Sequence, residues 1–193
     1  MRIISFGKQI PIMKCKVQDN QTKKFVPATV YNVDCNNFSD YETVKKAKGE
    51  WIFKDYILSN MRTKMLINNI PGFKTTDEFY LLKTALDNNV IGMVQTCNKD
   101  DGINIKYIEA KSGEKYKYAG QNMLASLAKK LQKENGGALI VNAPVMSAIP
   151  FYISKCGFRY KENGKLILQS DESAEFIKRT EEITQTNLID LQG

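Results

Sequence analysis

The sequence predicts a mixed α/β fold, in which a mostly antiparallel sheet is flanked by helices and begins with a β-hairpin. Strand-like and helix-like segments alternate along the chain, and three strand-like segments joined by short turns stand in its middle. Its 193 residues, of which 42% are apolar and 25% charged, fit one globular domain. We therefore expect a single domain over residues 1–193, with an N-terminal part (10–66), a core (79–168) and a C-terminal tail (171–193).

The N-terminal part is expected to form a hairpin followed by two short helices. Residues 10–18 alternate imperfectly between apolar and polar types, residues 25–35 are rich in β-branched and aromatic types, and a polar turn separates the two segments. Ser39 is followed three residues later by Glu42, a capping-box pair that predicts the first turn of a short helix. Apolar residues at helical spacing predict a second helix from about 51 to 65.

The core and the tail combine further strands with three helices. Predicted strands, each bounded by turn residues, lie at 79–87, 88–97, 103–110, 138–144, 158–162 and 165–170. Predicted helices lie at about 120–134, 146–155 and 171–185. Asn163 and Gly164, between the last two strands, are a strong hairpin signal.

The sequence contains no histidine, and this absence excludes several kinds of site. A Ser-His-Asp triad, a Cys-His dyad and a histidine-ligated metal site all need a residue that the chain lacks. Proton transfer then falls to carboxylates, tyrosine, lysine, cysteine or ordered water. The four cysteines form no CxxC pair, so we expect buried thiols in a reducing cytoplasm and no metal site.

The charge of the chain favours anionic partners without choosing among them. The formal net charge is +7 at pH 7, carried mostly by lysines that are spread along the sequence. A base-reading surface usually gathers arginines, so a solvated lysine-rich surface is favoured and nucleic acid is a less favoured partner. No apolar run reaches the roughly 18 residues of a membrane helix, and the N-terminus carries no secretion signal. We therefore expect a cytoplasmic protein with no membrane partner.

Three motifs between Val90 and Phe158 carry a resemblance to a known superfamily. They are VIGMV before a strand ending in YIEA, then KYKYAGQNMLASLAKKLQ, and then LIVNAPVMSAIPFYISKCGF. In this order they resemble the Gcn5-related N-acetyltransferases (the GNAT superfamily), and the order of the predicted elements is similar as well. The resemblance implies a GNAT-like sheet and an enzyme that transfers an acetyl group from acetyl-CoA to an amine by direct attack on the thioester.

The second motif resembles the phosphate-binding turn of that superfamily, Gln/Arg-x-x-Gly-x-Gly/Ala, which a helix follows. The resemblance implies acetyl-CoA contacts at Lys115, Lys117, Tyr118, Ala119, Gly120 and Gln121. Free N–H groups and the dipole at the helix start would hold the diphosphate. Lys115 stands where the superfamily has Gln or Arg, and Tyr118 stands at the position of its first Gly.

The strand over 103–110 is expected to lie along the pantetheine arm of acetyl-CoA. The resemblance implies cofactor contacts at Tyr107 and Ile108, and an N–H from Ile108 or a neighbour would polarise the thioester carbonyl. Strand alternation predicts that the side chains of Ile105, Tyr107 and Glu109 share one face.

Two residues are the candidate catalytic groups. Tyr152 matches the general acid of the superfamily, the tyrosine before the Gly-Phe corner, and would protonate or hydrogen-bond the departing thiolate. Glu109 is the candidate base that takes the proton of an incoming ammonium through water, and Glu78 and Glu50 are weaker alternatives.

A second interpretation stays open beside the enzyme. Tyr118 departs from the superfamily pattern, and so does Val145, which stands where Asn is frequent. A GNAT-like domain with altered cofactor use would be a binding module for an acidic protein or nucleic acid. A third interpretation keeps the enzyme and makes the amine acceptor a charged tRNA or a protein rather than a small molecule.

Overall fold

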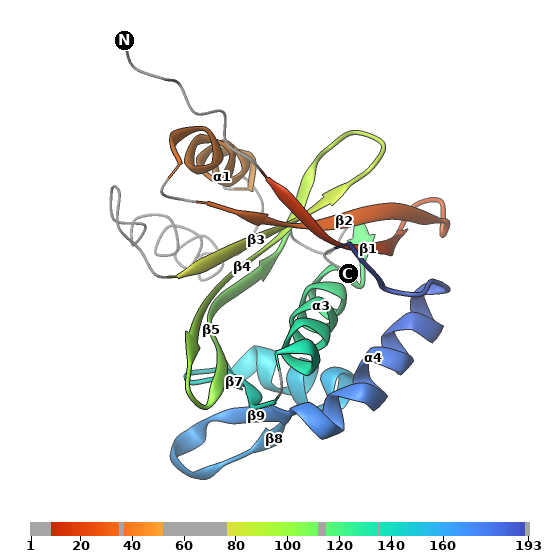
Figure 1. Ribbon diagram of the computed structural model, residues 1–193. Helices are drawn as coiled ribbons and strands as arrows, with labels where there is room; N and C mark the ends of the chain where they lie inside the picture. The colour runs from red at the N-terminus through yellow and green to blue at the C-terminus, as the bar shows by residue number, and fades with distance from the viewer. Residues whose placement is uncertain (1–8, 35–36, 52–76, 112–114, 135, 192–193) are drawn as a thin grey trace.

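The computed structural model describes residues 9–34, 37–51, 77–111, 115–134 and 136–191. Its centre is a ten-stranded, mostly antiparallel sheet in the order β10-β1-β2-β3-β4-β5-β7-β9-β8, with β6 paired to β1. The strands are β1 (Ile10–Asp19), β2 (Phe25–Val33), β3 (Glu78–Thr84), β4 (Val90–Lys99), β5 (Gly102–Ala110), β6 (Tyr116–Lys117), β7 (Ala138–Val141), β8 (Arg159–Tyr160), β9 (Leu166–Gln169) and β10 (Ile189–Asp190). The helices α1 (Phe38–Trp51), α3 (Ala119–Lys133) and α4 (Ser170–Thr184) flank the sheet (Figure 1). The predicted fold class, with its N-terminal hairpin β1–β2, is confirmed.

The sheet separates two apolar clusters, one on each face. On β3, Tyr80 and Leu82 belong to the larger cluster beneath α3 and α4, whereas Phe79 and Leu81 belong to a smaller cluster with Val44 of α1. Successive side chains of a strand point to opposite faces, so one apolar strand serves both clusters. Figure 1 shows α3 and α4 on one side of the sheet and α1 on the other.

Helix α1 begins two residues earlier than the sequence pattern indicates, at Phe38 rather than Asp40. The N–H of Ser39 donates to the side-chain oxygen of Asn37 at 3.0 Å, so Asn37 rather than Ser39 supplies the capping group. Ser39 lies inside the helix, and the expected capping box was wrong. The second predicted helix, at 51–65, lies outside the described residues apart from Trp51, which ends α1.

The helix predicted at 146–155 forms as two short turns of different kinds. Residues Met146–Ala148 make a 3-10 turn, and Phe151–Lys155 make a π-helix. Gly157, at φ 79°, follows it and leads into β8, a left-handed conformation that glycine adopts without strain. Single π-helical turns are often found at functional sites, and this one carries Tyr152.

The C-terminal segments return to the N-terminal edge of the sheet. Asn163 and Gly164, at φ 66° and 71°, form the predicted turn between β8 and β9. After α4, β10 pairs with Met13 and Lys14 of β1 in antiparallel register. The tail thus docks as an edge strand.

None of the helices in the described ranges is long and apolar enough to cross a membrane. In that same part of the chain, no three Cys, Asp or Glu side chains gather into a group that would hold a metal ion.

Candidate functional site

Strands β5 and β7 are paired at one end and separate at the other. Their parallel pairing runs from Gly102 and Ala138 to Ile105 and Val141, where β7 ends. β5 continues to Ala110 and stays paired with β4. Figure 1 shows β5 running on past β7 toward the end of the sheet at which α3 begins. Among the described strands, the second half of β5 therefore has a neighbour on its β4 side and a gap on its β7 side.

A β-bulge marks the point of separation. Two adjacent residues of β4 pair with Ile105 and Tyr107, so Lys106 is an extra residue in β5. The bulge reverses the alternation of side chains: Ile105 packs in the cluster beneath α3, whereas Tyr107 packs against the cluster on the α1 side. The expectation that Ile105 shares a face with Tyr107 and Glu109 was therefore wrong, while Tyr107 and Glu109 lie on the same side as expected.

The backbone amides of β5 beyond the bulge alternate between β4 and the gap. The N–H of Lys111 donates to the carbonyl of Ile91 in β4 at 2.9 Å. Antiparallel strands alternate the direction of their N–H groups, so that of Glu109 also faces β4. The N–H groups of Ile108 and Ala110 consequently face the gap. Ile108 is the residue that the sequence analysis assigned to the thioester carbonyl.

Helix α3 begins beside this gap. Ala119 at its start lies in the apolar cluster against which Ile108 of β5 packs. Tyr118, the residue before the helix, is left-handed at φ 70° and ψ 6°. The N–H groups of residues 119–121 have no helical carbonyl one turn earlier, and the first turn contains no acidic residue. These donors and the positive end of the helix dipole suit an anion.

The side chain of Tyr118 lies against the hairpin. Its ring stacks on that of Phe25, at the start of β2, with centroids 6.3 Å apart and an interplanar angle of 18°. A left-handed residue other than glycine costs on the order of 1 kcal/mol, and an aromatic pair contributes about as much. The stack therefore offsets the strain of a tyrosine in this backbone conformation.

The two lysines of the turn are exposed. The ammonium of Lys115 lies 5.1 Å from the ring centroid of Tyr116 and 3.9 Å from the carboxylate of Asp87. Contact with Tyr116 and the nearby carboxylates of Asp87 and Asp19 raise the pKa of Lys115, which stays cationic at neutral pH. Lys117 is exposed as well, so both residues add positive charge near the start of α3.

The π-helix places two aromatic side chains next to that helix start. Tyr152 is 5% exposed, and its ring meets those of Phe151 and Phe158 edge to face at 5.5 and 5.4 Å. Phe151 lies against Gly120, where a β-carbon would come 3.2 Å from the ring. The close approach of Phe151 therefore explains why residue 120 is a glycine.

The two candidate catalytic side chains lie on opposite sides of the sheet. Tyr152 belongs to the cluster beneath α3, whereas Glu109 is half-buried on the α1 side. The structure does not bring them together. Of the weaker alternatives, Glu78 accepts two hydrogen bonds from Lys130, at 2.9 and 2.7 Å, on the α3 side. The side chain of Glu50 lies outside the described part of the chain.

The sequence analysis missed Asn122, which connects the turn with the hairpin. Asn122 is fully buried, and its side-chain amide donates to the carbonyls of Tyr118 and Lys16, at 3.0 and 2.8 Å. A signal was present in the sequence, because Asn122 and Ser126 stand one helical turn apart within an apolar stretch. Polar residues buried at such a spacing require partners. The bulge at Lys106 has no comparable signal.

Comparison with known proteins identifies the architecture. No protein-family model matches the sequence, and no curated protein is significantly similar to it. Solved structures are similar: AtaTR bound with AcCoA has a TM-score of 0.54 at 15% identity, over 77% of this chain and 96% of that chain. Apo FdhC, a nucleotide-linked sugar GNAT, has 0.53 at 14%, over 88% and 98%. Tetrahymena Gcn5 has 0.51 at 14%, over 69% and 89%.

Proposed function

From the GNAT fold of this chain, we propose that it is an N-acetyltransferase that uses acetyl-CoA as the acetyl donor. The observation that carries the proposal is the separation of β5 from β7 beyond Ile105 and Val141. It leaves backbone donors of β5 without a β7 partner, and a helix start lies beside them. A fold alone does not imply a function, so the proposal rests on this arrangement of donors.

The gap would bind the two parts of the donor in different ways. The N–H groups of Ile108 and Ala110 face the gap; that of Ala110 would pair with an amide of the pantetheine arm, and that of Ile108 would be left for the thioester carbonyl. The diphosphate would lie at the start of α3, where the N–H groups of 119–121 lack helical partners and Lys115 and Lys117 supply positive charge. Tyr107 would line the arm on the α1 side of the strand.

The chemistry needs a polarised carbonyl and a proton for the leaving group. The thioester supplies a carbonyl carbon to which the amine nitrogen bonds while the carbon–sulfur bond breaks. The N–H of Ile108 would hold the carbonyl oxygen as negative charge develops there. The hydroxyl of Tyr152 would donate its proton, or a hydrogen bond, to the departing sulfur. Tyr152 lies on the α3 side of the sheet, the side of the proposed diphosphate site.

The amine would arrive from the other side of the sheet. Glu109 and Tyr107 lie on the α1 side, so an ammonium approaching there would meet the carboxylate of Glu109. Glu109 would accept its proton through water, which releases the nitrogen lone pair for attack. Donor and acceptor would then meet in the gap from opposite faces, and their alignment would supply a large part of the rate.

Titration calorimetry with acetyl-CoA, and with CoA as its control, tests the donor site. We expect micromolar dissociation constants for both; binding of neither would reject the enzyme. An acceptor screen follows, and Tyr152→Phe should then lower kcat about a hundredfold with little change in CoA affinity. Tyr160→Phe is the matched control, because Tyr160 lies exposed in β8. Equal activity of the Tyr152→Phe variant would remove Tyr152 from the mechanism.

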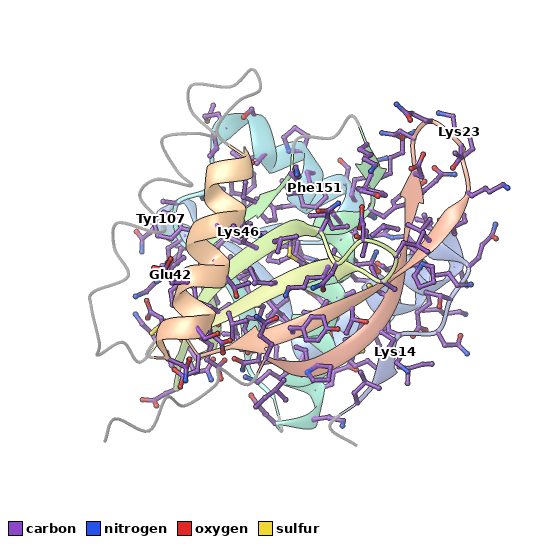
Figure 2. All side chains as sticks on the ribbon, turned by 90° about the horizontal axis from the view of Figure 1, so that it is seen from above. Lys14, Lys23, Glu42, Lys46, Tyr107 and Phe151 are labelled. Atoms are coloured by element: carbon purple, nitrogen blue, oxygen red, sulfur yellow. The ribbon has the colours of Figure 1, made fainter. Side chains whose placement is uncertain are left out.

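A basic surface on the hairpin favours a second candidate function, the binding of an acidic macromolecule. Three lysines of the hairpin are exposed, and in the part of the chain that the structure describes they form no ion pair: Lys14, Lys23 and Lys24. Figure 2 shows Lys14 and Lys23 on the hairpin, away from α1. Such a surface suits a phosphate backbone, whether of a binding partner or of a tRNA that carries the amine.

Binding of a labelled single-stranded RNA at increasing salt tests this second candidate. The expected result is an affinity that falls steeply with salt, survives Tyr152→Phe and is lost on changing the three hairpin lysines to Glu. The control changes three exposed lysines elsewhere: Lys99, Lys155 and Lys161. Equal losses in both variants would indicate a general charge effect and reject a binding surface on the hairpin.

A further inference from the structure

The tip of the β1–β2 hairpin is joined to the turn that precedes α3. β6 pairs with the end of β1, where Lys117 lies opposite Gln18 and Tyr116 opposite Asp19. Beyond this pairing, the N–H of Asn20 donates to the carbonyl of Lys115 at 2.7 Å. The turn is therefore a third strand along the hairpin tip rather than an independent loop.

The hairpin tip itself has a fixed shape. One carboxylate oxygen of Asp19 accepts the N–H groups of Gln21 and Thr22, both at 2.9 Å, and the N–H of Asp19 donates to the carbonyl of Lys24 at 2.9 Å. The two backbone donors lower the pKa of Asp19, so the carboxylate stays charged and keeps these bonds at neutral pH. A rigid tip is able to impose its register on the segment paired with it.

Two side chains complete the connection, one from each side. Asn122, in the first turns of α3, bridges the carbonyls of Lys16 in β1 and Tyr118 in the turn. Phe25, at the start of β2, stacks on the ring of Tyr118. Both contacts converge on Tyr118, the residue held in the left-handed conformation at φ 70°.

We propose that Asn122 is a positioning residue, which uses the hairpin to hold Tyr118 and thereby aims the first amides of α3 at the diphosphate of the donor. This inference rests on the proposed function for its ligand, but the connection itself does not. Packing against Phe25 and the bridge of Asn122 hold Tyr118 in the left-handed conformation, which tyrosine does not favour by itself. The hairpin thereby allows a tyrosine at a position where the superfamily turn has glycine.

The proposal predicts which part of the donor binds less tightly when Asn122 is changed. The bridge fixes the start of α3, whereas the arm of the donor would pair with β5. Loosening the turn should therefore weaken ligands that carry the diphosphate and leave the interaction of β5 with the arm unchanged. A merely structural role of Asn122 would lower global stability and would not separate the two parts of the ligand.

The first experiment needs no ligand. Amide hydrogen exchange is followed in peptides covering 115–121, for wild type, Asn122→Ala and the control Ser126→Ala. Ser126 is equally buried one turn further along α3 and donates to the carbonyl of Asn122 without touching the turn. We expect exchange to rise about tenfold in Asn122→Ala, the equivalent of one lost hydrogen bond, and to stay near wild type in Ser126→Ala. Unchanged exchange in Asn122→Ala would overturn the connection.

The second experiment uses CoA and acetyl-pantetheine, which lacks the diphosphate. For Asn122→Ala we expect CoA affinity to fall about tenfold and the competition of acetyl-pantetheine against CoA to become relatively stronger by the same factor. Equal weakening of both ligands would overturn the positioning role. If wild type binds neither ligand, the proposed function fails, and the exchange experiment still decides whether the hairpin holds the turn.

A second variant covers the case that Asn122→Ala does not fold. Phe25→Ala removes the stack from the hairpin side, and Tyr31→Ala removes a half-buried aromatic of the same strand whose ring faces Lys83 instead. Phe25→Ala should reproduce the faster exchange and the loss of CoA affinity, and Tyr31→Ala should not. The same behaviour in both variants would contradict the proposal.

Discussion

The ring of Phe151 lies against the α-carbon of Gly120, so close that a β-carbon at Gly120 would stand 3.2 Å from the ring. This contact joins the π-helix that carries Tyr152 to the first turn of α3. The proposed proton donor and the proposed diphosphate site are therefore connected through one pair of residues. A shift of either element would move the other.

Gly120→Val should expose this connection. The branched side chain would displace the Phe151 ring, and we expect the free energy of unfolding to fall by about 2 kcal/mol, a cost typical of overpacking. Phe151→Leu makes room, so the double variant should recover at least about 1 kcal/mol relative to additivity. Chemical denaturation of the four proteins measures the coupling. Additive effects would mean that the two residues do not interact.

Gly102→Ala should be among the most damaging changes in the sheet. Gly102 has φ 132°, and a β-carbon there would lie 2.1 Å from the carbonyl oxygen of Ala138 in β7. We expect a loss of at least about 3 kcal/mol, because strain and a backbone clash add up at the pairing that precedes the gap. Gly136→Ala is the matched control: its φ is 120° and no atom lies within 4 Å of the added carbon. Equal losses in both variants would show that only backbone strain matters.

Tyr118→Gly should be more stable than Tyr118→Ala. Glycine adopts the left-handed conformation freely and offsets the loss of the stack on Phe25, so we expect a change below about 1 kcal/mol. Alanine keeps the strain and loses the stack, and it should be less stable than glycine by about 1 kcal/mol. Thermal and chemical unfolding measure the difference. A more stable alanine variant would show that residue 118 is not left-handed in solution.

Thiol labelling should distinguish three of the cysteines. Cys15 and Cys156 are buried, and burial raises the pKa of each thiol to about 12, whereas Cys97 is partly exposed. At pH 9 we expect iodoacetamide to modify Cys97 in the folded protein, and Cys15 and Cys156 only in denaturant. Mass spectrometry of the peptides identifies each site. Fast native labelling of Cys15 would contradict its burial.

The same two thiols give stability a pH dependence of known sign. In the unfolded chain they ionise near the ordinary value of 9.0, and in the folded chain near 12. Between these values the folded state retains protons that the unfolded state releases, so the free energy of unfolding falls as pH rises above 9. Replacing Cys156 by Ala should make this decline shallower. A decline of the same slope in that variant would assign it to other groups.

Much of the architecture was predictable because it depends on local patterns. Runs of apolar residues bounded by turn residues gave β3, β4 and β5, and the Asn163–Gly164 pair gave the last hairpin. The strands β6 and β10 are two residues long and exist because β1 offers them an edge. Pairings of that kind leave no pattern in their own sequence.

The candidate site was predictable in its sequence position but not in its geometry. The resemblance located the turn at 115–120 and the tyrosine at 152. Because Lys106 is an extra residue in β5, the side chains of Ile105 and Tyr107 lie on opposite faces of the sheet. An alternating sequence is compatible with either arrangement. The bridge of Asn122 depends on the meeting of α3 with β1, more than a hundred residues apart along the chain.

Strand β1, the first of the described strands in the sequence, has its pairing completed only by β10, the last of them. β1 pairs with β2 next to it in sequence, with β6 at 116–117 and with β10 at 189–190. During synthesis, β1 therefore leaves the ribosome well before two of its partners, β6 and β10. Contacts so distant in sequence slow folding, and an edge strand without its partner is prone to pair with another molecule. The arrival of β10 would thus complete the pairing of β1 and cover part of the edge through which the newly made chain could misassemble.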